Sequence, residues 1–293
     1  MKTKSELKSQ SAMEYLMTYG WAILAIAIVM VSLYSLGIFN LGSLQPTATP
    51  GSCQVIRTAA QTSLAGQCNN LIPKYVGQFN GANSYADIGN SSSLNLISAF
   101  TITAWVSPRY PPNSNVAYGQ LAAKTDSQGA GGYEFGWLGN QNPCAPIYVT
   151  NGPSTLNSNQ NICTSGWSFI AMTFDGTTTV LYINGQAHGS NSGISYPSSI
   201  QHTGIGRAPG RTGYPYNGLI ADVQIYNASL DSSSLQTLYK EGIGGDPINL
   251  NNLKGWWPLN GDANDYSGNN NKGVPNNIVW NANWQSGYTQ PTS

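Results

Sequence analysis

The chain has 293 residues, which is enough for one large all-β domain with an anchor or for two small domains. Its 12 basic and 12 acidic residues cancel, and only 8% of all residues are charged, so no basic stripe is present to hold nucleic acid. The 17 tyrosines and 8 tryptophans are enough to build a core, which argues against a disordered chain.

An uncharged stretch from Tyr15 to Phe39 follows three lysines, Lys2, Lys4 and Lys8. As an α-helix this stretch is about 37 Å long, whereas the hydrocarbon core of a membrane is about 30 Å thick. We therefore expect one long hydrophobic N-terminal α-helix that crosses the cell membrane. Because lysines favour the cytoplasmic side, the C-terminal domain is expected at the extracellular surface.

The residues at the start of this stretch, Gln10-Ser11-Ala12-Met13-Glu14-Tyr15-Leu16, resemble the archaeal class III signal peptide of type IV pilin-like proteins. The resemblance implies that a prepilin-type peptidase cuts between Ser9 and Gln10. Residues 1–9 are then a cytoplasmic leader that is removed. Residues 10–40 remain as the hydrophobic pilin-like helix.

Glu14 lies at the edge of the apolar stretch, where an unpaired carboxylate is costly. After cleavage, the new α-amino group of a neighbouring subunit offers this carboxylate a partner. We therefore expect Glu14 to support the assembly of like subunits into a filament. The alternative is a plain single-span anchor in which Glu14 lies at the cytoplasmic interface.

Residues 41–70 are expected to form a linker and a cysteine-containing loop, because Pro46 and Pro50 end the helix. An even number of cysteines in an exported chain suggests disulfides. Pairing by proximity in sequence gives two bridges, while the other two connectivities stay open. The pairs are Cys53 with Cys68 and Cys144 with Cys163.

The chain beyond residue 70 has the pattern of a β protein. Residues 100–106 alternate between one set of apolar side chains and a set made of threonines and one tryptophan. Further strands are expected at 167–174, 178–183, 186–188 and 219–226, with Asp-Gly and Asn-Gly turns between some of them. A short helix follows, with Asp231 as its cap and Gly242 at its end. Many strands with frequent turns predict a two-sheet sandwich or jelly roll.

Four segments, 79–88, 100–106, 166–185 and 218–227, resemble the laminin G-like, concanavalin A-like jelly-roll family. The resemblance implies one ectodomain over residues 71–293. Folds of this kind carry lectins, adhesins and enzymes alike.

The segment 255–268 looks like the one that opens such modules, yet here it comes last. Either the module is circularly permuted or a truncated second copy begins here. We expect a strand near 255–260 in the same jelly roll, beside the strand that contains Gln78 and Phe79.

Catalytic residues are sparse in the ectodomain, whose only glutamates are Glu134 and Glu241. Glycosidases generally use two carboxylates about 5–10 Å apart, and no Glu-x-Asp-x-Glu strand or Ser-His-Asp pattern is present. His188 and His202 are expected to be ordinary surface residues. The chain is therefore predicted not to be an enzyme, and a glycoside hydrolase is the less favoured reading.

A calcium site is one interpretation of the acidic and Asn-rich segment 262–271, since Ca²⁺ prefers oxygen ligands. The laminin G-like resemblance implies Asp222 and Asp265 as ligands, with Asp262 as a third. The alternative is an Asx-rich turn without metal.

Aromatic rings in Gly- and Pro-rich loops are candidates for stacking on sugars, or for plugging the ends of the sandwich. These candidates are Tyr110, Trp137, Tyr214 and Tyr216. Asn90 and Asn227 begin Asn-x-Ser sequences and are glycosylation acceptors in form.

The whole pattern predicts a cell-surface pilin-like or adhesin subunit that displays a lectin-like domain for carbohydrate or surface binding. The alternative is a monomeric, membrane-anchored carbohydrate-binding protein.

Overall fold

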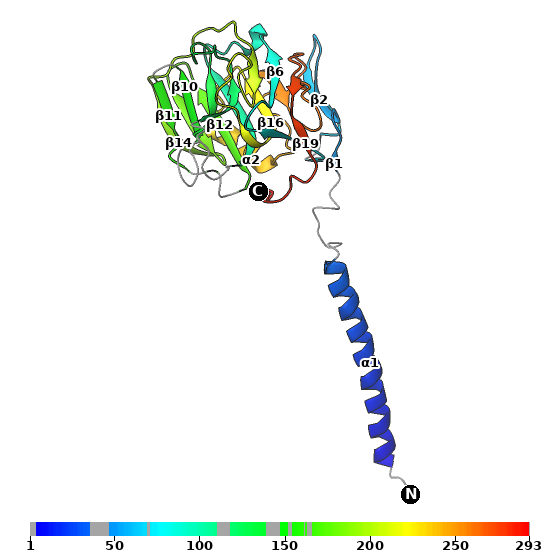
Figure 1. The fold of residues 1–293 in the computed structure, drawn as a ribbon. Coiled ribbons are helices and arrows are strands. Elements are labelled where there is room, and N and C mark those ends of the chain that lie inside the picture. The colour runs from blue at the N-terminus through cyan, green and yellow to red at the C-terminus, as the bar shows by residue number, and fades with distance from the viewer. Residues whose placement is uncertain are drawn as a thin grey trace. The chain divides into compact units, whose positions relative to one another are not determined.

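The computed structural model describes residues 4–35, 47–68, 71–109, 118–138, 147–151, 154–160, 162 and 166–292. The chain divides into two compact units, Met1–Pro46 and Thr47–Ser293 (Figure 1). The cysteine-containing part of the predicted 41–70 linker belongs to the second unit.

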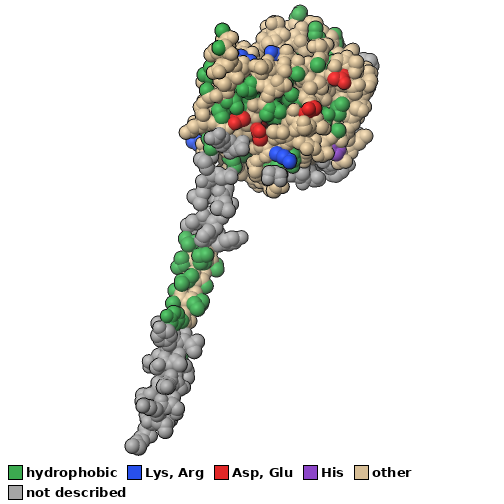
Figure 2. Space-filling view, turned by 180° about the vertical axis from the view of Figure 1, so that it is seen from behind, with side chains coloured by type: hydrophobic (Ala, Val, Ile, Leu, Met, Phe, Trp, Pro, Cys, Tyr) green, Lys and Arg blue, Asp and Glu red, His purple; other side chains and the backbone are tan. Residues whose placement is uncertain are grey.

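The first unit contains α1, Lys4–Ser35, so a helix is present where the sequence predicts one, although its bounds differ from the expected 10–40. Its side chains from 19 to 33 are mostly apolar and exposed, as the green part of the helix in Figure 2 shows. Within the described residues, no helix combines the length and the apolarity that crossing a membrane requires, so they do not support the predicted span. The side chains of Ser9, Gln10 and Glu14 lie outside the described residues.

The second unit is a sandwich of two antiparallel sheets, which confirms the predicted mainly β, two-sheet architecture (Figure 1). The seven-stranded sheet has the order β11 (Ser154–Asn157), β10 (Ile147–Asn151), β9 (Glu134–Leu138), β8 (Tyr118–Ala123), β15 (Thr203–Ile205), β6 (Tyr85–Gly89) and β18 (Val274–Asn276). The eight-stranded sheet has the order β14 (Gln186–Asn191), β13 (Thr179–Ile183), β12 (Ser168–Phe174), β7 (Phe100–Pro108), β16 (Asn217–Tyr226), β5 (Val76–Asn80) and β19 (Val279–Asn281), and β17 (Leu253–Trp257) pairs with β16 as well.

The main core lies between the two sheets and is built by the alternation of β7. Phe100 and Ile102 point into this core, where they meet apolar side chains of the opposite sheet. The other face of β7 is buried too, because Trp105 belongs to a second apolar cluster. The ring of Trp105 stacks on Tyr239 of helix α2 (Ser232–Glu241) at 5.8 Å between centroids. The eight-stranded sheet is therefore the middle layer of three.

Helix α2 has the signals that the sequence predicts. Asp231 is its N-cap, and the Asp231 side chain accepts a hydrogen bond of 2.8 Å from the backbone N–H of Ser234. Gly242 ends the helix with a φ of 79°, which glycine adopts without strain. Leu235 and Leu238 are buried against the sheet.

The C-terminal strand β17 joins the same sandwich, as expected, but its neighbour is β16 rather than the strand of Gln78 and Phe79. That strand, β5, pairs instead with β19. The reason is a bulge in β16 at Asp222, whose φ is 49°. Before the bulge β16 pairs with β5, and beyond it β16 pairs with β17. β17 is therefore a strand of this sandwich.

The predicted cysteine loop is an ordered hairpin of β2 (Cys53–Arg57) and β3 (Thr62–Gly66), and β1 (Thr47–Ala48) pairs with β4 (Ile72–Pro73). The disulfide Cys53–Cys68 closes the hairpin and confirms the first predicted pair. Arg57 fixes the hairpin to the sandwich, because its guanidinium donates hydrogen bonds to three backbone carbonyls of the segment 250–267. Cys144 and Cys163 lie outside the described residues.

Replacing Trp257 by alanine is predicted to lower the free energy of unfolding by about 3–5 kcal/mol, since this ring is fully buried in the main core. Val279→Ala on the exposed edge strand β19 is the control and should cost less than about 1 kcal/mol. Denaturant titration of the full chain measures both. Equal stabilities of the two variants would show that the C-terminal strand is not part of the core.

Candidate functional site

Three neighbouring strands place polar side chains on the outer face of the seven-stranded sheet. Glu134 of β9 stands opposite Thr150 of β10, and Thr150 stands opposite Thr155 of β11. Tyr148 lies two residues before Thr150 and therefore on the same face. The chain neighbours of these residues point the other way, into the core: Phe135, Val149 and Leu156.

Glu134 is the centre of a hydrogen-bonded network on this face. Its carboxylate forms an ion pair with Arg211, and its second oxygen accepts a hydrogen bond of 2.6 Å from Tyr148 Oη. The Glu134 and Arg211 side chains are 4% and 13% exposed. Charges this far from water are stable only when paired, so each holds the other in a fixed position.

Arg211 is also held from its other side. Its Cζ atom lies 4.1 Å from the centroid of the Tyr214 ring, which is a cation–π contact. Tyr214 has a φ of 65°, a left-handed conformation that is rare for a bulky residue and that occurs often at binding sites. Gly129 has a φ of 80°, which favours glycine, and a Cβ there would lie 3.0 Å from Arg211 Nη1 and crowd the guanidinium.

These groups surround a cavity of about 200 Å³. The amide of Gln128 and the hydroxyls of Thr150 and Thr155 line it beside the ion pair and the ring. Such a surface offers a carboxylate that accepts hydrogen bonds, a guanidinium that donates them, and an aromatic face. The arrangement suits a small ligand rich in hydroxyl groups.

The residues that the sequence predicts for sugar binding lie in different places in the structure. Tyr214 lines this cavity. Trp137 and Tyr216 are 3% and 1% exposed and meet edge to face at 6.1 Å in the main core. We correct the prediction for these two, because a ring packed on all sides has no face for a ligand. Tyr110 lies outside the described residues.

The proposed calcium ligands of the C-terminal loop make hydrogen bonds to the protein itself. Asp265 accepts hydrogen bonds from three backbone N–H groups. Asp262 accepts hydrogen bonds of 2.7 Å from Asn264 Nδ2 and Tyr266 Oη. This is the pattern of an Asx-rich turn.

Asp222, the third of these residues, is buried at the bulge of β16. It accepts a hydrogen bond of 2.8 Å from Trp256 Nε1 and two of 3.0 Å from Gln224 Nε2. Within the described part of the chain, Asp222, Asp262 and Asp265 do not gather into one cluster of metal ligands. Calcium binding stays a prediction.

Both predicted glycosylation acceptors are exposed at the ends of strands. Asn90 follows β6 and Asn227 follows β16. His202, expected on the surface, is exposed and lies 2.8 Å from Asp87. Figure 2 shows one face of the sandwich, where charged side chains are isolated spots on a mostly uncharged surface.

A laminin G domain model, described as the concanavalin A-like lectin/glucanases superfamily, matches residues 80–236. The chain belongs to this superfamily. The match confirms the laminin G-like, concanavalin A-like resemblance found in the sequence. No curated protein matches the chain.

Several solved structures are similar in fold to this concanavalin A-like chain. A proposed carbohydrate-binding protein of Bacteroides ovatus is 17% identical over 77% of this chain, with a TM-score of 0.52, and the chain spans 65% of that protein's length. A heptameric SAP-like pentraxin of Limulus polyphemus is 12% identical over 70% of this chain and 94% of its own, with a TM-score of 0.51. The CBM40 of a Ruminococcus gnavus IT-sialidase, bound to α2,3-sialyllactose, is 13% identical over 56% of this chain and 96% of its own, with a TM-score of 0.44. At these identities the likeness shows the fold alone.

On the opposite side of the concanavalin A-like domain, three carboxylic acids interact electrostatically. Burial and, to a smaller extent, the charges of Glu241 and Asp246 raise the pKa of Asp222 to about 7, although the hydrogen bonds from Gln224 and Trp256 lower it. Burial likewise raises the pKa of Glu241 to about 7 and that of Asp246 to about 6. The sequence gives no sign of this cluster, because its members come from β16, the end of α2 and the loop after it.

The raised pKa values predict that the domain loses stability as the pH rises from about 4 to about 7. The folded chain keeps these protons up to pH 6–7, while the unfolded chain releases them near pH 4. Asp222→Asn should therefore raise the melting temperature at pH 8 by about 5 °C or more and flatten the pH profile.

Asp126→Asn, in the turn at 126–130, is the control and should leave the pH profile unchanged. Melting curves of the full chain between pH 4 and pH 8 measure the effect. A wild-type profile that rises towards pH 8 would contradict the assignment.

Proposed function

We propose that this chain is a cell-surface carbohydrate-binding protein and that the cavity around Glu134, Arg211 and Tyr214 binds the sugar. The observation that carries the proposal is the convergence of a fixed ion pair, an aromatic ring and hydroxyl groups on one cavity of about 200 Å³. Sugars present hydroxyls that exchange hydrogen bonds with carboxylates and guanidinium groups, and C–H faces that pack on rings. The superfamily match and the carbohydrate-binding neighbours agree with this chemistry.

We expect the ligand to be an uncharged saccharide. Arg211 is neutralised by Glu134, so the cavity offers no unpaired positive charge to a sialic or uronic acid. Vicinal hydroxyls, by contrast, can donate to the Glu134 carboxylate and accept from the Arg211 N–H groups.

Binding fits this cavity better than hydrolysis does. Glycosidases generally act with two carboxylates about 5–10 Å apart. Among the described lining residues, Glu134 is the one carboxylic acid, and it is tied to Arg211 and Tyr148.

Tyr214→Ala is predicted to weaken the binding of neutral oligosaccharides by about tenfold or more, because it removes the ring and loosens Arg211. Tyr85→Ala is the matched control, since the guanidinium of Arg207 also lies over the Tyr85 ring, at 4.5 Å from its centroid, but neither residue lines the cavity. A glycan array followed by calorimetry on the full chain measures both. Equal losses in the two variants, or no binding to any neutral glycan, would refute the assignment.

We further propose that α1 packs against the helices of like subunits, as in a pilin-like filament at the cell surface. A helix that is apolar on all sides needs cover from lipid or from other helices, and Trp21, Ile26 and Val31 are 71%, 64% and 67% exposed. The class III signal-like motif at Gln10 supports the same role. The alternative is a monomer that α1 anchors to the membrane without polymerising.

Glu14→Ala is predicted to leave the protein exported and processed at Gln10 but to abolish filaments, since the partner of Glu14 is expected on a neighbouring subunit. Glu6→Ala is the control, because Glu6 lies in the leader that cleavage removes. Filament yield and the mass of the mature N-terminus are measured together. Normal filaments from the Glu14 variant would favour the plain anchor.

A further inference from the structure

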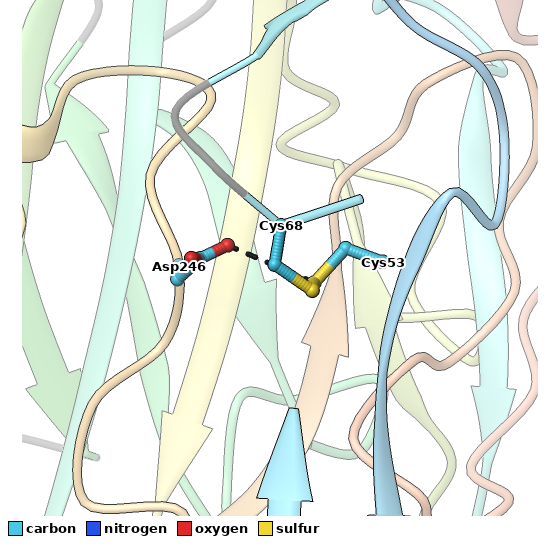
Figure 3. Close-up of side chains that lie close together, drawn as sticks. All are labelled: Cys53, Cys68 and Asp246. Atoms are coloured by element: carbon cyan, nitrogen blue, oxygen red, sulfur yellow. Dashed lines mark hydrogen bonds between the residues drawn. A yellow bond between two sulfur atoms is a disulfide. The ribbon is translucent and has the colours of Figure 1, made fainter. Parts of the chain in front are cut away.

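The Cys53–Cys68 disulfide has a carboxylic acid beside it. Asp246 Oδ1 lies 3.7 Å from Cys53 Sγ, and Figure 3 shows the Asp246 side chain pointing at the disulfide. A sulfur in a disulfide carries no hydrogen. A hydrogen bond between these two atoms therefore needs a proton on the Asp246 carboxyl, which then donates to the sulfur.

The disulfide is also reachable from solvent. Both cysteines are only half-buried, and both line a cavity of about 50 Å³ together with Asp246. Trp256 and Tyr266 line the same cavity, which has room for the sulfhydryl end of a small thiol.

Burial raises the pKa of Asp246, so its carboxyl keeps a proton up to about pH 6. The titratable groups near it are Glu241, at the end of α2, Asp222, in β16, and Tyr266, which lines the same cavity, and none of them is basic. No basic side chain forms an ion pair with Asp246 among the described residues.

We propose that Cys53–Cys68 is a site of thiol–disulfide exchange with small thiols, in which Asp246 is the acid that protonates the departing Cys53 sulfur. The thiolate of the incoming thiol, which is the reductant, attacks Cys68 Sγ and forms a mixed disulfide with it. The Cys53–Cys68 bond breaks, and its electron pair goes to Cys53 Sγ. The Asp246 carboxyl transfers its proton to this sulfur and becomes a carboxylate, so Cys53 leaves as a neutral thiol. A second thiolate then attacks the small-thiol sulfur of the mixed disulfide and forms a disulfide of the small thiol, and Cys68 leaves as a thiolate.

The β2–β3 hairpin keeps most of its contacts when the disulfide is reduced. The ladder between β2 and β3 runs from the Cys53–Gly66 pair to the Arg57–Thr62 pair. Arg57 holds the far end of the hairpin on the sandwich through three backbone carbonyls. Reduction therefore frees the mouth of the hairpin above the cavity and leaves the domain folded.

The test is the rate at which dithiothreitol reduces this disulfide in the folded full chain, followed by alkylation and peptide mapping of Cys53 and Cys68. Dividing the wild-type rate by the Asp246→Asn rate at each pH cancels the ionisation of the reagent. We expect a ratio of about ten or more at pH 5 that falls towards one above pH 7. Asp246→Glu keeps the acid and should stay close to wild type, while Asp175→Asn, on an exposed turn, is the control.

A ratio near one at every pH, or the same change in Asp175→Asn, would overturn the proposal. If Asp246→Asn does not fold, the reduction rates of wild type and Asp246→Glu are measured against pH and corrected for the reagent's thiolate. Their corrected rates must then fall between pH 5 and pH 7, and flat profiles would overturn the proposal equally. The sugar-binding cavity lies on the other sheet, so neither result depends on it.

Discussion

The eight-stranded sheet is buried on both faces, and the rest of the second unit depends on this constraint. One face meets the seven-stranded sheet across the main core. The other face carries Trp105, Phe169 and Tyr226, and each such side chain left in water would cost on the order of 2 kcal/mol. Helix α2, the β2–β3 hairpin and the C-terminal segment supply the cover, with Trp256 and Trp284 packed into the same cluster. The N-terminal hairpin and the C-terminal segment of the unit thus both cover the outer face of the eight-stranded sheet.

The candidate ligand cavity lies on the opposite side of the sandwich. On the outer face of the seven-stranded sheet, no helix of the described residues covers the polar side chains of β9, β10 and β11, and the ion pair of Glu134 and Arg211 stands among them. The pair is fixed by Tyr148 on one side and by the ring of Tyr214 on the other. A rigid set of donors and acceptors loses little entropy when a ligand arrives, which favours binding.

Local signals in the sequence were enough for the strands that form the middle of the fold. The alternation at 100–106 predicts β7, the Asp-Gly and Asn-Gly pairs predict the hairpins around β13, and Asp231 predicts the start of α2. Contacts between residues far apart in the sequence could not be predicted from local patterns. The neighbour of β17 depends on the bulge at Asp222, which no residue pattern announces. The cavity needs Glu134 and Arg211 to meet across 77 positions, and only the sheet topology brings them together. Trp137 looked like a loop residue because Gly-rich neighbours hid the strand that buries it.

Hydrogen–deuterium exchange of the full chain, with and without the neutral oligosaccharide that binds best, would locate the ligand most directly. Binding on the outer face should slow the exchange of backbone amides in β9, β10 and the segment 211–214, which supply residues that line the cavity. The amides of the β2–β3 hairpin and of α2, on the covered side, should exchange at unchanged rates. Protection confined to the hairpin and α2, with none in β9 and β10, would contradict the placement of the site on the seven-stranded sheet.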